Sequence, residues 1–443
     1  MTIQLPEKVK YILDTLLAAG YDAYAVGGCV RDSILGRIPD DWDITTSALP
    51  EQVKSLFKRT IDTGIQHGTV TIMLEKEGFE VTTYRIDGEY EDSRHPKEVI
   101  FTPNLVDDLK RRDFTINAMA YNEQTGMVDE FQGMEDLKRK IIRAVGNPEE
   151  RFTEDALRIM RAIRFSAQLG YTIEQDTREA IEKLAPTLQN ISAERIQVEL
   201  VKLITSKNPY WLKDAYETGV TKIILPELDT MMETPQNNPH HQYSVGEHVL
   251  HSMEYVGQDK VLRLAMLFHD VGKPQKRITK DGIDHFYNHA AVGEEMVKKI
   301  LRRLKFDNDT IYKVSKIVCF HDYKIELTPK AVRRAIAKIG EDIFPYLFDV
   351  KKADALSQSN YQRQEKLEKL ETLKKIYDKV IEDKNCVSLK TLAVTGKDLI
   401  EAGFQPGKEL GEILQYLLLQ VIDEPEKNEK EILIKIAIQG KEK

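Results

Sequence analysis

The stretch AVGGCVRDSILGR (25–37), followed closely by DDWDITT (40–46), carries the most informative local pattern in this sequence of 443 residues. An apolar run, a Gly27-Gly28 pair and a helical pattern in succession predict a strand, a tight turn and a helix, and so a mixed α and β head. Backbone N–H groups at the start of such a helix bind phosphate, and Arg31 would lie within reach of it. A plain strand-to-helix turn is the alternative interpretation of a lone Gly-Gly pair.

Two carboxylates follow this turn. Asp41 and Asp43 are two residues apart and would point the same way if Trp42 lay in a strand. Neighbouring carboxylates repel one another unless a cation joins them, and Mg²⁺ held by carboxylates and substrate phosphates is typical of phosphoryl-transfer sites. An acidic, solvated turn after Pro39 is the alternative, and the nearby phosphate turn weighs against it.

The strand-like runs lie in the first third of the chain: AYAV (23–26), DITT (43–46), GTVTIML (68–74) and FEVTTYRI (79–86). Helical periodicity begins at EERF (149–152) and continues to the end, with a loop expected around Lys280. We therefore predict an α+β head, a sheet with helices, followed by an elongated all-α neck, body, third domain and tail. The predicted boundaries are 1–143 for the head, 144–233 for the neck and body, 234–360 for the third domain and 361–443 for the tail.

The composition is that of a globular protein, with 41% hydrophobic and 31% charged residues. The three cysteines form no CxxC pair, which argues against a disulfide framework or a zinc ribbon. The first residues do not resemble a signal peptide, and no apolar run approaches the ~18 residues of a membrane span. We expect a cytoplasmic protein with no membrane partner.

The net charge of −8, from 64 Lys+Arg and 72 Asp+Glu, argues against a nucleic-acid partner when it is averaged over the chain. A polyanion responds only to the surface that it approaches, however. We therefore predict a basic strip in the segment that links head and neck, formed by Arg111, Arg112, Lys138, Arg139, Lys140 and Arg143.

GGCVRDSILGR together with DDWDIT resembles the signature of the DNA polymerase β-like nucleotidyltransferases, and DLKRRDFTINAMAYN (108–122) narrows the resemblance to the class II tRNA nucleotidyltransferases, the CCA-adding enzymes of bacteria. The resemblance covers roughly residues 20–200. It implies addition of C, C and A to the tRNA 3′ end from CTP and ATP, without a nucleic-acid template. It also implies that Asp41 and Asp43 bind catalytic Mg²⁺ and that four residues bind the nucleotide, namely Gly28, Arg31, Arg112 and Asp113. CC-only or A-only enzymes and poly(A) polymerases are the alternatives.

The segment EDALRIMRAIRF (154–165) is predicted to be one helix that places Glu154 and Asp155 shortly before Arg158. Cytosine and adenine both present an amino donor beside a ring-nitrogen acceptor, so a carboxylate next to an arginine matches them and repels uracil and guanine. A solvated helix with i, i+4 ion pairs explains the same pattern. The family resemblance assigns base recognition to Asp155 and Arg158, assisted by Arg161 and Arg164, and implies that Arg111 contacts tRNA phosphate.

Two further features of the head bear on its activity. Glu80 is either a third carboxylate near the metals or a surface residue of a strand. The resemblance implies that a loop between Glu80 and RRDFT separates complete from partial CCA addition. GEYEDSRHPKEVIF (88–101) reads as an intact loop, which favours addition of all three nucleotides.

A second set of candidate ligands lies in the third domain: His248, His269, Asp270, His289, His321 and Asp354. Imidazoles and carboxylates are ligands for transition metals, and an Asp beside a His in an apolar helix is costly unless it is coordinated. The order of the six residues, with Lys273 after HDVG, resembles the HD phosphohydrolase superfamily and implies a bound divalent transition metal. Hydrolysis of phosphorylated ends and a purely structural site are both open. The remaining histidines nearby are expected to be ordinary surface or helix residues: His240, His241, His251 and His285.

The tail segment TGKDLIEAGFQPGKELGEILQYLLLQ (395–420) places Gly403 and Pro406-Gly407 before a helix. The pattern is typical of an ordinary connection between helices, and it is also compatible with phosphate binding at the helix start. Resemblance to the tails of family members favours a tRNA-binding role, with Lys397 and Lys408 nearby.

Overall fold

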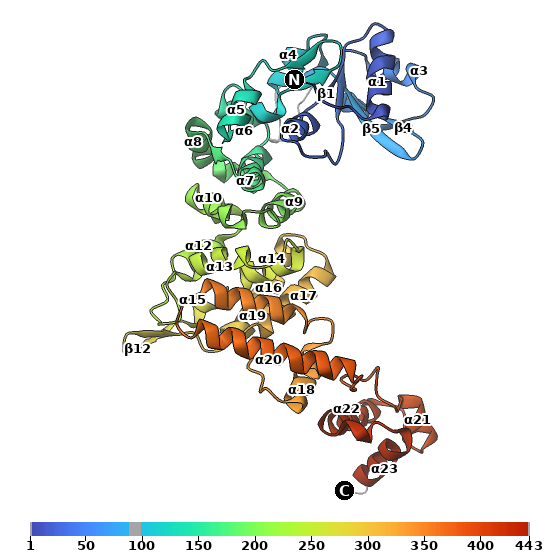
Figure 1. The fold of residues 1–443 in the computed structure, drawn as a ribbon, viewed down its shortest axis with the longest axis vertical. Helices are drawn as coiled ribbons and strands as arrows, with labels where there is room; N and C mark the ends of the chain where they lie inside the picture. Colours follow the sequence, from blue (N-terminus) through green and yellow to red (C-terminus); the bar gives the residue numbers. More distant parts are fainter. Residues whose placement is uncertain (1, 88–98, 442–443) are drawn as a thin grey trace. The chain divides into compact units, whose positions relative to one another are not determined.

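The computed structural model describes residues 2–87 and 99–441, and the chain divides into two units, Met1–Pro226 and Glu227–Lys443 (Figure 1). Within the described part of the first unit, seven strands form one mixed sheet in the order β3-β4-β5-β2-β1-β8-β9. The strands of this unit are β1 (Ala23–Val26), β2 (Ile44–Thr46), β3 (Thr60–Gly64), β4 (Thr69–Leu74), β5 (Glu77–Thr83), β6 (Arg85–Asp87), β7 (Val99–Phe101), β8 (Ala120–Asn122), β9 (Gly126–Val128), β10 (Ile141–Ile142) and β11 (Thr172–Ile173).

Helices pack around the sheet and form most of the remainder of the first unit. They are α1 (Glu7–Ala18), α2 (Gly28–Ile34), α3 (Pro50–Leu56), α4 (Leu105–Lys110), α5 (Gly133–Arg139), α6 (Pro148–Glu154), α7 (Leu157–Leu169), α8 (Gln175–Leu184), α9 (Ala193–Ile204), α10 (Leu212–Glu217) and α11 (Thr221–Ile224). Short 3-10 turns lie between them: η1 (Ile65–His67), η2 (Thr115–Asn117), η3 (Ala185–Asn190) and η4 (Pro209–Trp211).

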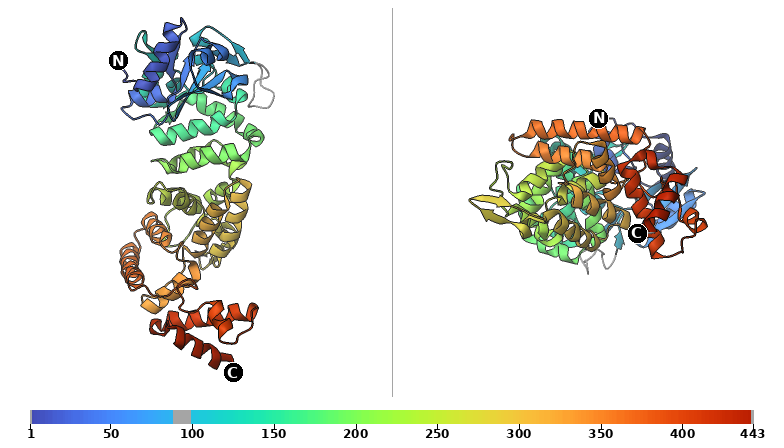
Figure 2. Two further views of the ribbon diagram at one scale, coloured as in Figure 1. Left: turned by 90° about the vertical axis from the view of Figure 1, so that its right-hand side faces the viewer. Right: turned by 90° about the horizontal axis from the view of Figure 1, so that it is seen from below.

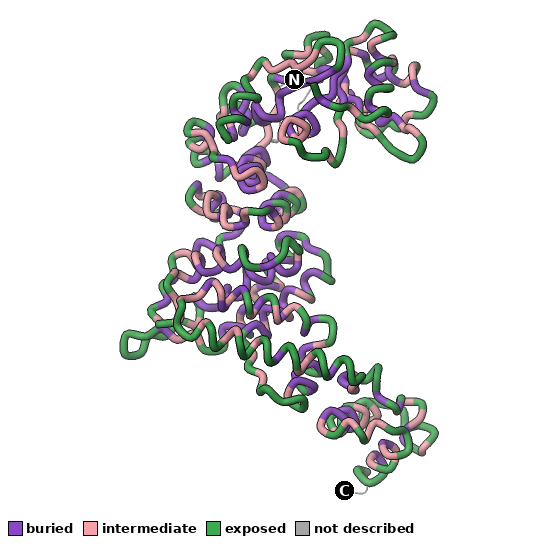
Figure 3. The backbone as a smooth tube through the Cα atoms, viewed as in Figure 1, coloured by how far each residue is buried: buried purple, intermediate pink, exposed green. Residues whose placement is uncertain are grey.

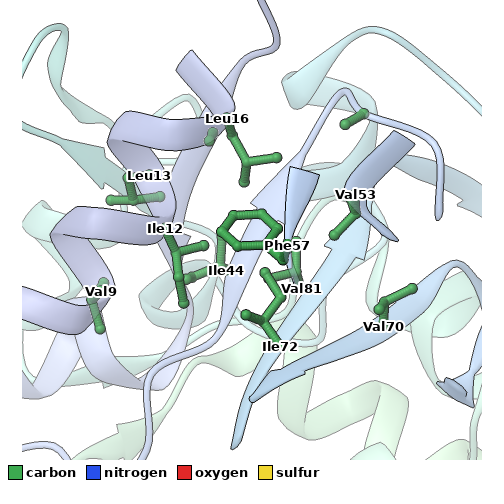
Figure 4. Packing of buried hydrophobic residues seen from close by; sticks show 12 residues of the cluster. Val9, Ile12, Leu13, Leu16, Ile44, Val53, Phe57, Val70, Ile72 and Val81 are labelled. Atoms are coloured by element: carbon green, nitrogen blue, oxygen red, sulfur yellow. The ribbon is translucent and has the colours of Figure 1, made fainter. Parts of the chain in front are cut away.

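A hydrophobic core between α1, α3 and the sheet fixes the strands that carry the site (Figure 4). Apolar residues recur along α1 at three- and four-residue steps, so one face of the helix is buried. Each fully buried Val, Leu, Ile or Phe contributes about 1.5–3 kcal/mol relative to an exposed one. The labelled members of this core are Val9, Ile12, Leu13, Leu16, Ile44, Val53, Phe57, Val70, Ile72 and Val81.

Strand β2 occupies the centre of the arrangement, antiparallel to β1 and parallel to β5. Its first residue, Ile44, pairs with Ala25 on one side and with Val81 on the other. The short loop before β2 therefore lies beside the end of β1 and the start of the buried part of β5.

The second unit is built from helices that bury their inner faces and expose their outer faces (Figure 3). The helices are α12 (Pro226–Met232), α13 (Val245–Glu254), α14 (Lys260–Phe268), α15 (Lys273–Lys276), α16 (His289–Arg303), α17 (Asn308–Phe320), α18 (Pro329–Ile339), α19 (Tyr346–Ser357), α20 (Arg363–Glu382), α21 (Gly396–Glu401), α22 (Lys408–Asp423) and α23 (Lys430–Lys441), with the 3-10 turn η5 (Pro425–Lys427). Helix α20 packs against α18 and α19 and can be followed in deep orange from two other sides in Figure 2.

The predicted α+β head with a helical remainder is confirmed, with two corrections. The neck, predicted to be all α, contains the short strand β11, which pairs in parallel with β10. The segment around Lys280 is a β-hairpin, β12 (Ile278–Lys280) and β13 (Ile283–His285), rather than a loop. Its turn residues Asp281 and Gly282 have φ values of 50° and 78°, the conformation that two-residue hairpin turns require. Across the described residues, no helix is both long enough and apolar enough to cross a membrane.

Candidate active site and candidate metal centre

Three carboxylates lie at one edge of the head sheet, namely the edge at which β1 ends and β2 begins. Trp42 does not lie in a strand, because β2 begins at Ile44 and both Asp41 and Asp43 precede it. The backbone still continues the sheet there, since Val26 N–H donates to the Asp43 carbonyl at 3.0 Å. The parallel register of Ile44 with Val81 places Asp43 opposite Glu80 of β5, so Glu80 faces the same edge.

The charges of these carboxylates act on one another. The Asp43 side chain is open to solvent, yet the surrounding protein removes enough hydration to raise its pKa, and the negative charges of Asp41 and Glu80 raise the pKa further. The Arg112 guanidinium opposes the shift. Mutual repulsion of this kind is relieved by a bound cation, and carboxylate oxygens are the ligands that Mg²⁺ prefers.

The glycine turn lies against the same edge. Gly27 precedes α2 with φ 84° and ψ −131°, a conformation that only glycine adopts readily. A Cβ atom at this position would lie 3.1 Å from Arg112 Nη1 and 4.0 Å from Asp43 Oδ2. The turn, the arginine and the carboxylate are therefore neighbours. Buried Asp108 holds Arg112 in place, accepting from its Nη2 at 3.4 Å.

Replacing Gly27 with Ala is expected to cost about 1–3 kcal/mol in folding free energy, because the backbone would be strained. Nucleotide binding, which the sequence resemblance assigns to Arg112, should also weaken, because the added methyl group displaces this side chain. Gly36→Ala is the matched control, since Gly36 has φ 69° and nothing lies within 4 Å of its Cβ position. Thermal unfolding measures the first effect and the KM for nucleotide measures the second. Equal KM values for the two variants would contradict a nucleotide-binding role of Arg112 beside the Gly27 turn.

Arg31 is already engaged by protein groups. It donates from Nε and Nη2 to Asp32 at 3.0 and 2.8 Å, and from Nη1 to Asn117 Oδ1 at 2.6 Å. Asn117 in turn donates to Asp113 at 3.1 Å, and Arg161 donates to the other Asp113 oxygen at 2.8 Å. Burial alone would raise the pKa of Asp113, but the Arg161 charge and the Asn117 N–H outweigh it and hold that pKa well below its usual range.

These bonds connect α2, η2 and α7 around one aromatic ring. The guanidinium carbons of three arginines lie close to the centroid of the buried Phe165 ring, at 5.0, 5.6 and 3.9 Å for Arg31, Arg161 and Arg164. Cations over aromatic faces are stabilised by the ring quadrupole. Each of these arginines also pairs with a carboxylate, Arg31 with Asp32, Arg161 with Asp113 and Arg164 with Glu199, so their positive charges are largely balanced within the protein.

The segment 154–165, predicted as one helix that reads the base, consists of two helices. Helix α6 ends at Glu154 and α7 begins at Leu157, because Asp155 is extended, with φ −139°. Its Oδ1 accepts from Leu157 N–H at 3.0 Å, so the carboxylate caps the second helix. The expected i, i+4 pair survives the break, since Arg158 Nη1 donates to Glu154 Oε2 at 2.7 Å.

Asp155 and Arg158 are one turn apart but bind different partners. Asp155 Oδ2 accepts from Arg195 Nη2 at 2.9 Å, and Arg158 Nη2 donates to the Arg111 carbonyl at 2.8 Å. The sequence analysis did not single out Arg195, nor Glu199, which accepts from Arg164 Nε at 2.5 Å. Both lie one turn apart on α9, and their opposite charges on an amphipathic helix were the available signal.

The basic strip and the tail lysines have mixed surroundings. Lys138, Arg139 and Lys140 are exposed at the end of α5, whereas Arg143 pairs with Asp136 at 3.1 Å. In the tail, Gly407 immediately precedes α22, and exposed Lys397 and Lys408 approach glutamates one turn away at 3.9 and 3.6 Å.

The predicted loop at 88–101 lies outside the described residues except for 99–101, which form β7.

Six side chains meet between helices of the second unit. In the described residues they form two adjoining groups of three, and within each group the candidate ligand atoms lie within 4.8 Å of one another. The first group is His248 of α13, His269 at the end of α14 and Asp354 of α19; the second is Asp270, His289 of α16 and His321 at the end of α17. All six residues predicted from the sequence are therefore brought together.

The histidine rings are held so that Nε2 points into the cluster. The Nδ1 atoms of three rings each donate to the carbonyl three residues earlier, at 2.7, 2.8 and 2.7 Å for His269, His289 and His321. The Nε2 atoms of His289 and His321 are 3.2 Å apart. Because Nδ1 carries the proton, both Nε2 atoms present lone pairs that repel unless a proton or a metal ion joins them.

Asp270 connects the two groups. Its Oδ2 is 3.3 Å from His269 Nε2, and its Oδ1 is 3.5 and 3.6 Å from Nε2 of His289 and His321. Burial alone would raise the pKa of Asp270, but the charges of His269 and Lys273 hold the pKa well below its usual value. Oriented imidazoles around buried carboxylates fit one or two divalent transition-metal ions.

His241 departs from the expectation of an ordinary histidine. Its ring contacts that of His248, with centroids 5.2 Å apart, and burial lowers its pKa to about 3. His240 packs against Tyr361, and His285 stacks on Tyr287. His251 lies on α13 with His248 but interacts with Glu254 at 3.2 Å. Of these four, only His241 touches a ring of the cluster among the described contacts.

Comparison with known proteins extends over the whole chain. Residues 23–143 match the poly A polymerase head domain, 170–232 the "Probable RNA and SrmB-binding site of polymerase A", and 282–437 "tRNA nucleotidyltransferase domain 2". A CCA-adding enzyme of Levilactobacillus brevis is 37% identical over 429 residues, covering 97% of this chain and 96% of the relative. The CCA-adding enzyme of Limosilactobacillus reuteri is 37% identical over 443 residues, with the same coverage.

Solved structures agree. The crystal structure of Bacillus stearothermophilus CCA-adding enzyme in complex with CTP is 31% identical, with a TM-score of 0.73 over 99% of this chain and 98% of that chain. Thermotoga maritima CCA-adding enzyme complexed with tRNA shares the fold, with a TM-score of 0.61 and 21% identity over 99% of this chain and 100% of that chain.

The mixed head sheet, its carboxylate edge and the matched head domain define a nucleotidyltransferase. The full-length relatives narrow this class, and the chain belongs to the family of CCA-adding enzymes. The family resemblance noted from the sequence motifs is thereby confirmed.

Proposed function

We propose that the head adds C, C and A in turn to the 3′ end of tRNA, using CTP and ATP and no nucleic-acid template. The observation that carries this proposal is the edge where Asp41, Asp43 and Glu80 lie beside the Gly27 turn and Arg112. The names of the relatives and the nucleotide- and tRNA-bound neighbours support the choice of substrates.

In this reaction the tRNA 3′-hydroxyl oxygen forms a bond to the α-phosphorus of the nucleotide, and pyrophosphate leaves. Asp41 and Asp43 would hold Mg²⁺, which supplies Lewis acidity at the reacting phosphate. Arg112, fixed by Asp108, would neutralise the triphosphate beside the Gly27 turn, and Arg161 would keep Asp113 ionised and oriented.

Base choice would rest on Asp155 and Arg158. Both groups already have protein partners, Arg195 and Glu154, so a base must share or replace these bonds. A carboxylate acceptor and a guanidinium donor one turn apart suit the shared amino and ring-nitrogen edge of cytosine and adenine. One site can therefore serve both nucleotides.

Product length distinguishes this function from that of a poly(A) polymerase. With a tRNA transcript that lacks CCA and a mixture of CTP and ATP, we expect extension to stop after three nucleotides. Runs of adenosine beyond that length on a sequencing gel would favour the poly(A) polymerase, and a halt after CC would favour a partial enzyme.

We further propose that the cluster in the second unit holds a divalent transition metal and hydrolyses phosphate esters. The opposed Nε2 atoms of His289 and His321 and the central Asp270 carboxylate support this assignment. A metal ion held there would supply Lewis acidity for cleavage of a phosphate ester. Lys273, 2.7 Å from Asp270, would fix that carboxylate.

Purified protein is expected to contain one or two equivalents of divalent metal per chain by elemental analysis. His248→Ala should lose much of this metal, because it removes one imidazole from the cluster. His251→Ala on the same helix is the matched control and should keep it. Equal metal contents in the two variants would contradict the site. The hydrolase activity is tested separately with a 2′,3′-cyclic phosphate as substrate. Metal-dependent cleavage that His269→Ala abolishes would support hydrolysis at this site. If the wild-type protein does not cleave the substrate, the metal has a structural role only.

A further inference from the structure

Two guanidinium groups of α6 and α7 meet the end of α4 in the head. Arg151 of α6 donates from Nη1 to the Lys110 carbonyl at 3.1 Å. Arg158 of α7 donates from Nη2 to the Arg111 carbonyl at 2.8 Å. Lys110 is the last residue of α4 and Arg111 is its C-cap, and carbonyls at a helix end have no partner within the helix. The two arginines therefore attach α6 and α7 to the C-terminal end of α4.

Glu154 joins the same two arginines to each other. Its Oε1 lies 2.5 Å from Arg151 Nη2, and its Oε2 accepts from Arg158 Nη1 at 2.7 Å. Arg158 Nη1 also donates to the Arg151 carbonyl at 3.1 Å. Exposed Glu150 approaches Arg151 only to 3.9 Å, where solvent screens the interaction. The largely buried side chains of Arg151, Glu154 and Arg158 thus form one clamp on the end of α4.

This clamp spans the point where the helical backbone is interrupted. Helix α6 ends at Glu154 and α7 begins at Leu157, with the extended residue Asp155 between them. The direction of a second helix is not fixed by the first where the continuous ladder of backbone hydrogen bonds is broken. Arg151 and Glu154, before the break, therefore hold the side chain of Arg158, after it, by direct contacts.

The same end of α4 is followed by Arg112, the residue assigned to the triphosphate. Buried Asp108, one turn earlier, accepts from Arg111 Nε at 2.9 Å and from Arg112 Nη2 at 3.4 Å. The groups proposed for the base and for the triphosphate are therefore both positioned from this end of α4. A misplacement of about 1 Å between groups that act on one substrate costs up to about a hundredfold in rate.

We propose that Arg151 is a positioning residue that sets base selectivity, because it holds Glu154, and through Glu154 the guanidinium of Arg158, against the end of α4. The inference rests on the proposed base-reading role of Arg158 and adds the residue that keeps this reader in place. Without Arg151, the Arg158 side chain gains freedom to turn, and its N–H donors can then meet the carbonyl oxygens of uracil or guanine.

Competition between CTP and UTP for a tRNA transcript that lacks CCA tests this role. In Arg151→Gln we expect the preference for CTP to fall about tenfold, while the rate at saturating CTP stays within about threefold of the wild type. Equal losses of rate with both nucleotides, at unchanged preference, would show that Arg151 only supports the fold and would overturn the proposal.

Arg178→Gln is the matched control. Arg178 of α8 also pairs with carboxylates, Glu217 at 2.9 Å and Asp214 at 3.5 Å, but no contact joins it to the clamp among the described residues. This variant should keep the wild-type preference for CTP. An equal fall of the preference in Arg178→Gln and Arg151→Gln would contradict a specific role of Arg151.

Two further variants test the clamp itself. Arg151→Lys keeps the charge but lacks the fork that reaches both Glu154 and the Lys110 carbonyl, so its preference should also fall. Wild-type preference in this variant would overturn the positioning role, and it serves as the comparison if Arg151→Gln does not fold. Because Arg151 and Glu154 act in one clamp, combining Arg151→Gln with Glu154→Gln should lower the preference no further than the stronger single change. Losses that multiply would contradict the clamp.

Arg158→Gln separates this inference from the function on which it rests. A fall of the preference in Arg158→Gln but not in Arg151→Gln would refute the positioning role and leave base reading by Arg158 intact. An unchanged preference in both variants would refute base reading itself, and the positioning role with it. We expect both variants to lose preference, Arg158→Gln the more strongly.

Discussion

Asp43→Asn should lower nucleotide incorporation by about a thousandfold or more, because the proposed Mg²⁺ site loses a charged ligand where the transition state gains charge. The fold should persist, since the side chain is open to solvent and the backbone bond from Val26 to the Asp43 carbonyl does not involve it. Removing one carboxylate also relieves repulsion with Asp41 and Glu80. Single-nucleotide incorporation into tRNA measures the effect.

Asp40→Asn is the matched control, because Asp40 is an exposed neighbour that has no part in the raised pKa of Asp43. It should incorporate nucleotides at the wild-type rate. If the two variants were equally active, Asp43 would not be a metal ligand. In that case the head would be a binding module, and the second unit would hold the only catalytic site among the described residues.

Asp155→Asn should change which nucleotides are used rather than whether any is used. Asparagine keeps the oxygen that caps Leu157 N–H, so the break between α6 and α7 should persist. The added amide donor would face the amino group of cytosine or adenine, so the preference over UTP and GTP should fall by about a hundredfold. Competition between labelled nucleotides measures this ratio.

Glu149→Gln is the control for that experiment. Glu149 is exposed on α6, the helix that ends just before Asp155, and pairs with Lys183 at 2.6 Å, so its loss changes charge without touching the base. Its selectivity should equal that of the wild type. An Asp155→Asn enzyme that retains full selectivity would contradict the role of Asp155 as base reader.

Local pattern was enough to predict the first strand and the meeting of the His and Asp residues in the second unit. The predicted strand AYAV has the same first and last residues as β1, because a short apolar run before a glycine pair is compatible with few other local structures. The six cluster residues were recognisable since buried His and Asp side chains in apolar helices need partners. The chemistry of those residues therefore predicted their meeting, although they come from five helical segments far apart in sequence.

The structural features that the sequence did not predict have identifiable physical causes. The break at Asp155 was hidden because helical periodicity continues across it, while the carboxylate caps the second helix instead of facing solvent. The hairpin at Ile278–His285 was overlooked because its strands are polar, although Asp281-Gly282 is a strong hairpin signal. Arg195 and His241 depend on contacts with distant elements, which periodicity does not report.

The net charge of −8 and an RNA substrate are compatible because charge is distributed unevenly. Many acidic groups are used internally: Asp108, Asp113 and Glu199 are buried against arginines. Lys138, Arg139 and Lys140 stay exposed at the end of α5. Affinity for tRNA should therefore fall as salt rises.

The most direct test uses three tRNA transcripts, ending before CCA, after CC and after CCA, each incubated with one labelled nucleotide at a time. CTP should label the first transcript only, ATP the second only, and neither should label the third. UTP and GTP should label none of them. Labelling of the complete tRNA by ATP, or of any transcript by UTP or GTP at the rate of CTP, would contradict template-independent CCA addition by this protein.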